Sequence, residues 1–277
     1  VDFGGDGLED LYVPNGFISY RNDKPDVSSF YWRQVLALSP ADSSPREEYG
    51  KAWNTIEHMT MHQGFSWAGN ERNTAFLNLG GGRFVDVSGI SGADALDDAR
   101  SVVTPDWDGD GRLDLIVRNR TAPRLRIFHN RSATSAHWLE VSLVDSLGNR
   151  DGIGAEVVVE LEERVLRKRL YAGSGYLAQS SKRLHFGLGA SERVKALEVH
   201  WPGGGKTRCE DLAGDAHWRI TRAAAEPEQV ERILAPLAAL PSDPIPRPAN
   251  KVERIVLVEK LPLPELRLTS YKGLEKR

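Results

Sequence analysis

The sequence predicts an all-β protein with more than one domain. Its 277 residues include 26 glycines and 15 prolines, and short apolar runs alternate with turn residues along most of the chain. This pattern is typical of many short strands joined by tight turns. A loop rich in aspartate, followed by an apolar strand, also occurs twice. The length is enough to bury one large or two medium hydrophobic cores.

The loop from Asp106 to Asp114 is the most informative stretch. It has carboxylates at positions 1, 3, 5 and 9 and glycine at position 6, and it runs into an apolar strand at Leu113–Val117. Oxygen ligands at alternate positions let a short loop wrap a hard cation, and glycine permits the sharp bend. Val117 stands where a helix–loop–helix calcium site would have glutamate, so we predict a calcium loop leading into a strand.

The expected calcium ligands are Asp106, Asp108, Asp110, the backbone carbonyl of Arg112, and Asp114. Carboxylates this close repel one another unless a dication lies between them. The simpler alternative is an acidic surface turn without an ion.

A second copy of the unit opens the chain. Asp2, Asp6 and Asp10 take positions 1, 5 and 9, and glycine again takes position 6. Position 3 is Gly4, so one ligand is missing, and we expect weaker calcium binding here or a water molecule in its place. Two such units form an internal repeat, so residues 1–134 are predicted to be part of a β-propeller. Because the chain opens inside a loop motif, we expect further domains on both sides.

Residues 17–70 do not follow the blade pattern. They mix aromatic and polar residues and have helical character from Glu47 to His62. We interpret them as an insertion over the propeller face and as a candidate partner surface, since long insertions often carry function. His58 and His62 lie four residues apart, but Met59 takes the place of the glutamate in the zinc-protease pattern. Ordinary surface or packing histidines are therefore the preferred interpretation.

Strand patterning returns after the insertion. Thr74–Asn78 and Arg83–Val87 are predicted to form a hairpin around a glycine turn, with Phe84 facing the interior. Arg124–Phe128 alternates like an outer strand that follows the second loop. These elements complete the predicted blades.

From His137 the chain changes character. Short strands separated by glycine predict a small β-sandwich or barrel over residues 135–222. Within it, His185 and Tyr176 are interpreted as core or turn packing residues rather than site residues. Residues 223–277 are rich in proline and are predicted to be a linker or the start of a further domain, with a short amphipathic helix at Glu226–Leu240.

Composition excludes several function classes. The formal net charge of −3 is too small to indicate binding to nucleic acid or a membrane surface. No apolar run is long enough to predict a membrane span. The single cysteine, Cys209, excludes an internal disulfide framework and a cysteine-rich zinc site.

Both parts of the chain resemble known families. Residues 1–134 resemble FG-GAP/VCBS repeats of integrin-type β-propellers, through Asp106–Val117 and more weakly through Asp2–Val13. Residues 135–222 strongly resemble the ASPIC/UnbV domain, which often follows such repeats. The matching motifs are Arg150–Ala155, Gly173–Leu177, Leu184–Gly189 and Trp201–Pro202. The resemblance implies calcium in the inter-strand loops and an extracytoplasmic, non-catalytic module.

The leading functional hypothesis is a non-catalytic extracytoplasmic module that binds calcium structurally and recognises a protein or carbohydrate, in adhesion or assembly. One alternative is an enzyme, or an enzyme's accessory domain, with its site at the face covered by the insertion. The residues to suspect there are Trp53, His58, His62, Trp67 and Glu71. A structural spacer is a third possibility.

Overall fold

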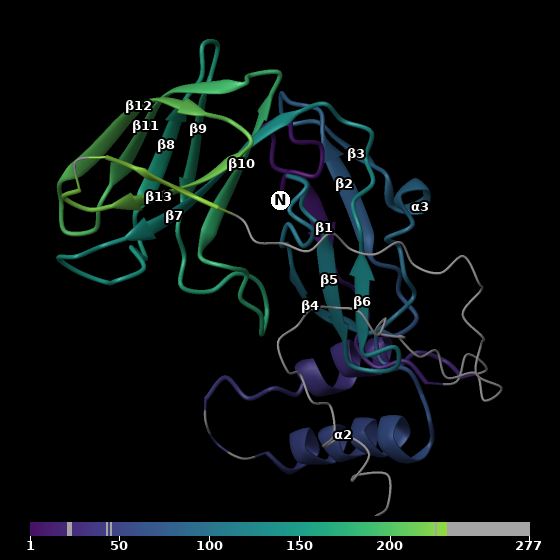
Figure 1. Ribbon diagram of the computed structural model, residues 1–277. Coiled ribbons are helices and arrows are strands. Elements are labelled where there is room, and N and C mark those ends of the chain that lie inside the picture. The colour runs from purple at the N-terminus through teal and green to yellow at the C-terminus, as the bar shows by residue number, and fades with distance from the viewer. Residues whose placement is uncertain (21–23, 43, 45, 225, 232–277) are drawn as a thin grey trace, which may run out of the picture.

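The computed structural model describes residues 1–20, 24–42, 44, 46–224 and 226–231 (Figure 1). Fourteen strands in four sheets and a few short helices make up the described part. The prediction of an all-β protein is therefore confirmed.

Two small antiparallel sheets form the part that contains both aspartate loops. The first has the order β1 (Leu11–Val13), β2 (Thr74–Asn78), β3 (Phe84–Asp86). The second has the order β4 (Ala99–Val103), β5 (Leu115–Asn119), β6 (Leu125–Phe128). Such meanders fit the blade-like units that the repeated motif predicts.

The two sheets share one strand register. Directly after its aspartate loop, Leu11 pairs with Phe76 in the first sheet and Leu115 pairs with Phe128 in the second. β1 and β2 of the first sheet therefore correspond to β5 and β6 of the second. The long insertion occupies the connection between β1 and β2, whereas a short turn joins β5 to β6. The repeat predicted from sequence is thus present at the level of individual residue pairs.

The insertion forms its own helical unit. It contains α1 (Ser28–Phe30), η1 (Tyr31–Leu36), α2 (Glu47–Glu57) and η2 (His58–His62), where η denotes a π-helix. Its small core is built around Val35 and Ile56, each 1% exposed. Figure 1 shows α2 beyond the ends of the two small sheets, on the side away from the larger sheets.

The remaining strands form a β-sandwich of two four-stranded sheets. One has the order β10-β7-β13-β14 and the other β12-β11-β8-β9. The bounds are β7 (His137–Val144), β8 (Glu156–Glu160), β9 (Val165–Arg169), β10 (Arg183–Gly189), β11 (Arg193–His200), β12 (Lys206–Ala213), β13 (Ala216–Thr221) and β14 (Glu228–Val230). Inward-facing residues of both sheets form one large core, with Val141, Val157, Phe186, Leu197 and Ile220 buried at its centre. The sandwich contains the largest hydrophobic core of the described residues.

Two sequence-based predictions are wrong at particular residues, and a third concerns residues outside the described part of the chain. Phe84 is 44% exposed rather than interior, because β3 is the three-residue edge strand of its sheet. A helix from Glu226 is wrong at its start, since β14 (Glu228–Val230) pairs with β13 and adds a strand to the sandwich. The rest of the predicted helix and the proline-rich linker lie outside the described residues.

The first aspartate loop packs against the sandwich through polar contacts. The Gly189 N–H donates to the Gly5 carbonyl over 2.9 Å, and the Arg164 guanidinium donates to the Asp6 carbonyl. The loop is therefore fixed to the end of β10 by its backbone.

Gly187 on β10 makes this close approach possible. An added Cβ at this position would overlap the Asp2 carboxylate and the Gly5 backbone. The absence of a side chain at Gly187 therefore permits the contact between the first loop and the sandwich.

We predict that Gly187→Ala lowers the free energy of unfolding by about 1–3 kcal/mol, because the added methyl group forces the loop off β10. Gly173→Ala is the matched control, since its Cβ would meet nothing within 4 Å. Urea unfolding of the two variants checks this. Equal stability of both would show that the first loop does not depend on close contact with β10.

Candidate metal centre

The two aspartate loops have the same hydrogen-bond pattern. In each, the position-1 carboxylate accepts from the backbone N–H groups of positions 4 and 6. The distances are 2.7 and 2.7 Å at Asp2 and 2.8 and 3.0 Å at Asp106. Glycines at both of those positions adopt positive φ, for example +81° at Gly7 and +87° at Gly111. The glycine spacing therefore sets the backbone N–H groups around one carboxylate.

The position-9 carboxylate ties each loop to its sheet. Asp114 accepts from Trp107 N–H at 3.0 Å and from Asn130 N–H at 2.7 Å. Asp10 accepts from the equivalent residues Phe3 and Asn78, both at 2.8 Å. Asp10 and Asp114 are 5% and 2% exposed. Buried carboxylates need such donors, because burial without hydrogen bonds is costly.

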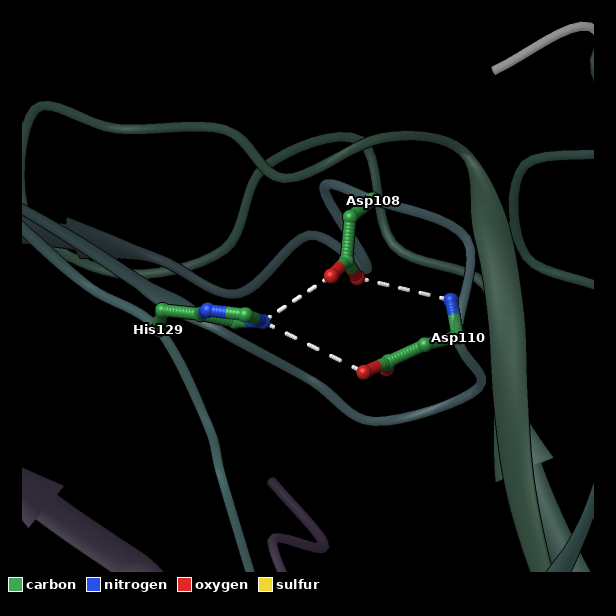
Figure 2. A group of neighbouring side chains, drawn as sticks. All are labelled: Asp108, Asp110 and His129. Carbon is green, nitrogen blue, oxygen red and sulfur yellow. Dashed lines mark hydrogen bonds and ion pairs between the residues drawn. The ribbon is translucent and has the colours of Figure 1, made fainter. Parts of the chain in front are cut away.

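The carboxylates at positions 3 and 5 of the second loop face a histidine instead. His129 Nε2, just beyond the end of β6, lies 2.9 Å from Asp108 Oδ2 and 4.0 Å from Asp110 Oδ2 (Figure 2). The ligand atoms of these three side chains lie within 4.8 Å of one another. Arg112 also contacts Asp110. Two carboxylates and an imidazole nitrogen at this spacing are a donor set that suits a divalent cation.

The first loop has no counterpart of this cluster. Position 3 is Gly4, and the residue equivalent to His129 is Leu77, since each directly follows the phenylalanine of the shared register. Asp6 is equivalent to Asp110, but it has no counterpart of the Asp108 carboxylate or the His129 imidazole beside it. Two of the three side chains in the second-loop cluster are thus replaced in the first loop, Asp108 by Gly4 and His129 by Leu77.

The predicted ligands of the second loop divide into two groups. Asp108 and Asp110 converge with His129, and Asp110 also accepts from the Arg112 N–H over 2.9 Å. Asp106 and Asp114 lie outside this cluster and accept from backbone N–H groups of the loop and its sheet. Each carboxylate oxygen has more than one lone pair, so these bonds leave room for a cation contact.

Sequence reasoning missed His129. This residue directly follows Phe128, the pairing partner of Leu115 in the strand that leaves the loop. The pairing of β5 with β6 therefore carries His129 back to the loop, and that register cannot be read from the spacing within the loop.

Burial raises the pKa of Asp110 and Asp114 above the ordinary value near 3.8, and neighbouring Asp108 acts in the same direction. Burial likewise raises the pKa of Asp2 and Asp10 in the first loop. The folded chain therefore disfavours the charged form of these carboxylates when no cation is bound. A bound dication would reverse that preference.

The second loop also contacts the sandwich directly. His185 Nε2 lies 2.9 Å from the Gly111 carbonyl, and the Trp138 ring stacks on His185 with centroids 6.0 Å apart. Burial lowers the pKa of His185 to about 4, and Lys168 acts in the same direction. The ring is therefore neutral at neutral pH, and Nε2 must carry the proton, because a carbonyl can only accept. His185 is buried as predicted, but its contact is with a loop outside the sandwich.

Four of the residues suspected for a catalytic site pack in two pairs through their rings. Trp53 and Trp67 pack with ring centroids 6.1 Å apart, and His58 and His62 with centroids 5.3 Å apart. Within the described chain, no side-chain hydrogen bond or ion pair joins any two of these residues and Glu71. Both histidines are exposed, as the preferred interpretation expects.

Tyr176 lies in a turn, which is one of the two places expected for it, but its side chain is not buried. Its side chain is 66% exposed, in the glycine-flanked loop between β9 and β10. A core position is therefore wrong for Tyr176, whereas its place in a turn that follows Gly173 and Gly175 is confirmed.

The family comparisons agree with this architecture. Residues 65–117 match the family model described as FG-GAP-like repeat, and residues 145–227 match the one described as ASPIC and UnbV. These matches, in this order along the chain, confirm both resemblances.

Curated relatives share about a third of their aligned residues with the chain. Cartilage acidic protein 1 of Mus musculus is 37% identical over 105 residues, which are 37% of this chain and 16% of the relative. The Xenopus tropicalis protein of the same name is 37% identical over 102 residues, or 36% of this chain and 16% of the relative. The Homo sapiens protein is 36% identical over 105 residues, with shares of 37% and 16%. The chain therefore spans only a small part of these relatives' length.

The raised pKa values lead to a pH prediction. Without a cation, the folded chain holds protons on Asp110 and Asp114 at pH values where the unfolded chain has released them. The free energy of unfolding therefore falls as the pH rises from about the ordinary carboxyl pKa of 3.8 through the raised pKa values of the folded chain. Calcium binding needs the carboxylates and has the opposite pH dependence. We expect the rise in melting temperature caused by calcium to be full near neutral pH and to vanish as the pH falls toward the raised pKa values. Calorimetry with calcium and with EDTA across this range measures it, and a rise independent of pH would contradict carboxylate ligation.

Proposed function

We propose that this chain is a non-catalytic, extracytoplasmic recognition or adhesion module in which calcium at the second aspartate loop has a structural role. The observation that carries the proposal is the cluster of Asp108, Asp110 and His129, which has no counterpart in the first loop. The weaker site proposed at Asp2, Asp6 and Asp10 would bind calcium with lower affinity.

The position of the loop supports a structural role for the ion. Asn130 donates to the Phe3 and Leu113 carbonyls over 3.0 and 3.2 Å, so it joins the two loops. His185 and Trp138 hold the second loop against the sandwich. An ion that orders the second loop would therefore also order the contact between the small sheets and the sandwich. Binding to the folded state alone would stabilise the whole chain.

The ligand of the module is proposed to be a protein or a carbohydrate. Two exposed surfaces support recognition. The insertion presents Trp32, which is 64% exposed, beside Tyr31. The glycine-flanked loop of the sandwich presents Tyr176 and Leu177, which are 66% and 77% exposed. Exposed aromatic residues are enriched where proteins meet partners.

The comparisons support a non-catalytic role. Neither family description names a reaction, and the name of the relatives names none. An extracytoplasmic location suits a site of this loop type, because extracellular modules bind calcium at millimolar concentration. Within the described residues, no helix combines the length and the apolar character that crossing a bilayer requires.

Calcium should raise the melting temperature of the full chain, and EDTA should reverse the effect, because the ion binds only the folded loop. The double variant Asp108→Ala with Asp110→Ala should lose most of this rise. Asp6→Ala in the first loop is the matched control and should keep it. Differential scanning calorimetry provides the measurement.

Magnesium, manganese and zinc form further arms of this experiment, because the carboxylates also suit magnesium and manganese and the His129 imidazole suits zinc. Stabilisation by zinc alone would identify a different ion for the site. No response of the unmodified chain to any of the four ions would refute the cation proposal.

A further inference from the structure

A polar cavity of about 260 Å³ lies on the sandwich, and no residue of either aspartate loop lines it. It opens on the outer face of β7, β10 and β13. Alternation along β7 turns Leu143 into the core and Ser142 outward. The lining includes Ser142, Arg150, Lys182, Arg183, His217 and Arg219. The cavity is therefore walled mainly by polar and basic side chains.

Strand register brings three of these residues into one row. Ser142 on β7 pairs with Arg183 on β10 and with Arg219 on β13. In the neighbouring row, Glu140 pairs with His217. The outer face of the sheet thus places one hydroxyl between two guanidinium groups, with a buried acid and imidazole beside them.

The hydroxyl of Ser142 shares a hydrogen bond with His217, and the direction of that bond depends on the imidazole tautomer. His217 Nε2 lies 2.8 Å from Ser142 Oγ, and His217 Nδ1 lies 3.7 Å from Glu140 Oε2. When Nε2 carries the proton, it donates to Ser142 Oγ, and the Ser142 proton is available to a ligand in the cavity. A polarised donor chain of this kind strengthens a hydrogen bond to an anion.

The charges around the cavity also favour an anion. Four cationic side chains surround it, and three of them have carboxylate partners: Lys182 with Asp151, Arg183 with Glu140, and Arg219 with Glu228. Arg150 forms no ion pair with any residue that the structure describes. Each guanidinium has five N–H donors, so a single carboxylate partner leaves several for a ligand.

A serine–histidine–acid catalytic site is the other interpretation of these residue types. The 3.7 Å separation of His217 and Glu140 exceeds hydrogen-bond distance. Ser142 also lies in a central strand, paired on both sides, so its backbone does not supply an oxyanion hole. Binding is therefore favoured over catalysis.

We propose that this cavity binds a tetrahedral oxyanion, a sulfate or phosphate group, through Arg150, Arg219 and Ser142. The group is either a free ion or the ester end of a larger ligand, since the cavity is open to solvent. This site is independent of the cation proposal, because none of its residues belongs to either aspartate loop.

The test is an NMR titration of the full chain at constant ionic strength with inorganic sulfate, inorganic phosphate, glucose 6-sulfate and acetate. Saturable shifts are expected at the amides of Ser142, Lys182 and Arg219 with the tetrahedral anions. Arg150→Gln with Arg219→Gln should weaken binding by about tenfold or more, because charge-assisted hydrogen bonds are lost. Ser142→Ala should weaken it to a smaller extent.

Arg167→Gln with Arg169→Gln is the matched control, since it removes the same charge from β9 on the other sheet. It should leave binding unchanged. Tighter binding of glucose 6-sulfate than of sulfate would identify an ester ligand, and the reverse would identify a free ion. Absence of saturable shifts, or equal weakening by both double variants, would overturn the proposal.

Discussion

The satisfaction of buried carboxylates by backbone N–H groups is the constraint on which the aspartate loops depend. The carboxylates of Asp2 and Asp106 each accept hydrogen bonds from glycine N–H groups of their loop. Those of Asp10 and Asp114 accept from the backbone N–H groups of Asn78 and Asn130. These bonds fix the loop shape and the register of the strands that follow. Position 5 is aspartate in both loops and accepts the position-7 backbone N–H, over 2.8 Å at Asp6 and 2.9 Å at Asp110. Position 3 differs between the loops, with Gly4 in the first and Asp108 in the second.

The same loops form the contact between the two parts of the chain. The lack of a side chain at Gly187 lets the first loop pack against β10. His185 forms a hydrogen bond with the Gly111 carbonyl of the second loop. A buried neutral histidine and a missing side chain are modest features individually. Together they connect the candidate ion site to the contact between the small sheets and the sandwich. Ion binding at the loop is therefore expected to stabilise that contact, and a substitution at the contact is expected to weaken ion binding.

Sequence was sufficient for what depends on local spacing. The glycine positions predicted the loop bends, and the repeat predicted the two related sheets. His129 was missed because it reaches the loop from the end of β6, which requires the register of β5 and β6. Phe84 was misplaced because alternation does not tell which strand is an edge. The role of His185 was missed because it depends on contact between domains, which no local pattern encodes.

Crystals of the chain grown with calcium would locate the ion directly, through an anomalous-scattering map. We expect a peak in the second loop, about 2.3–2.6 Å from carboxylate oxygens of Asp108 and Asp110, with a weaker peak or none in the first loop. A peak in the first loop alone, or no peak in either loop, would contradict the assignment of the second loop as the calcium site.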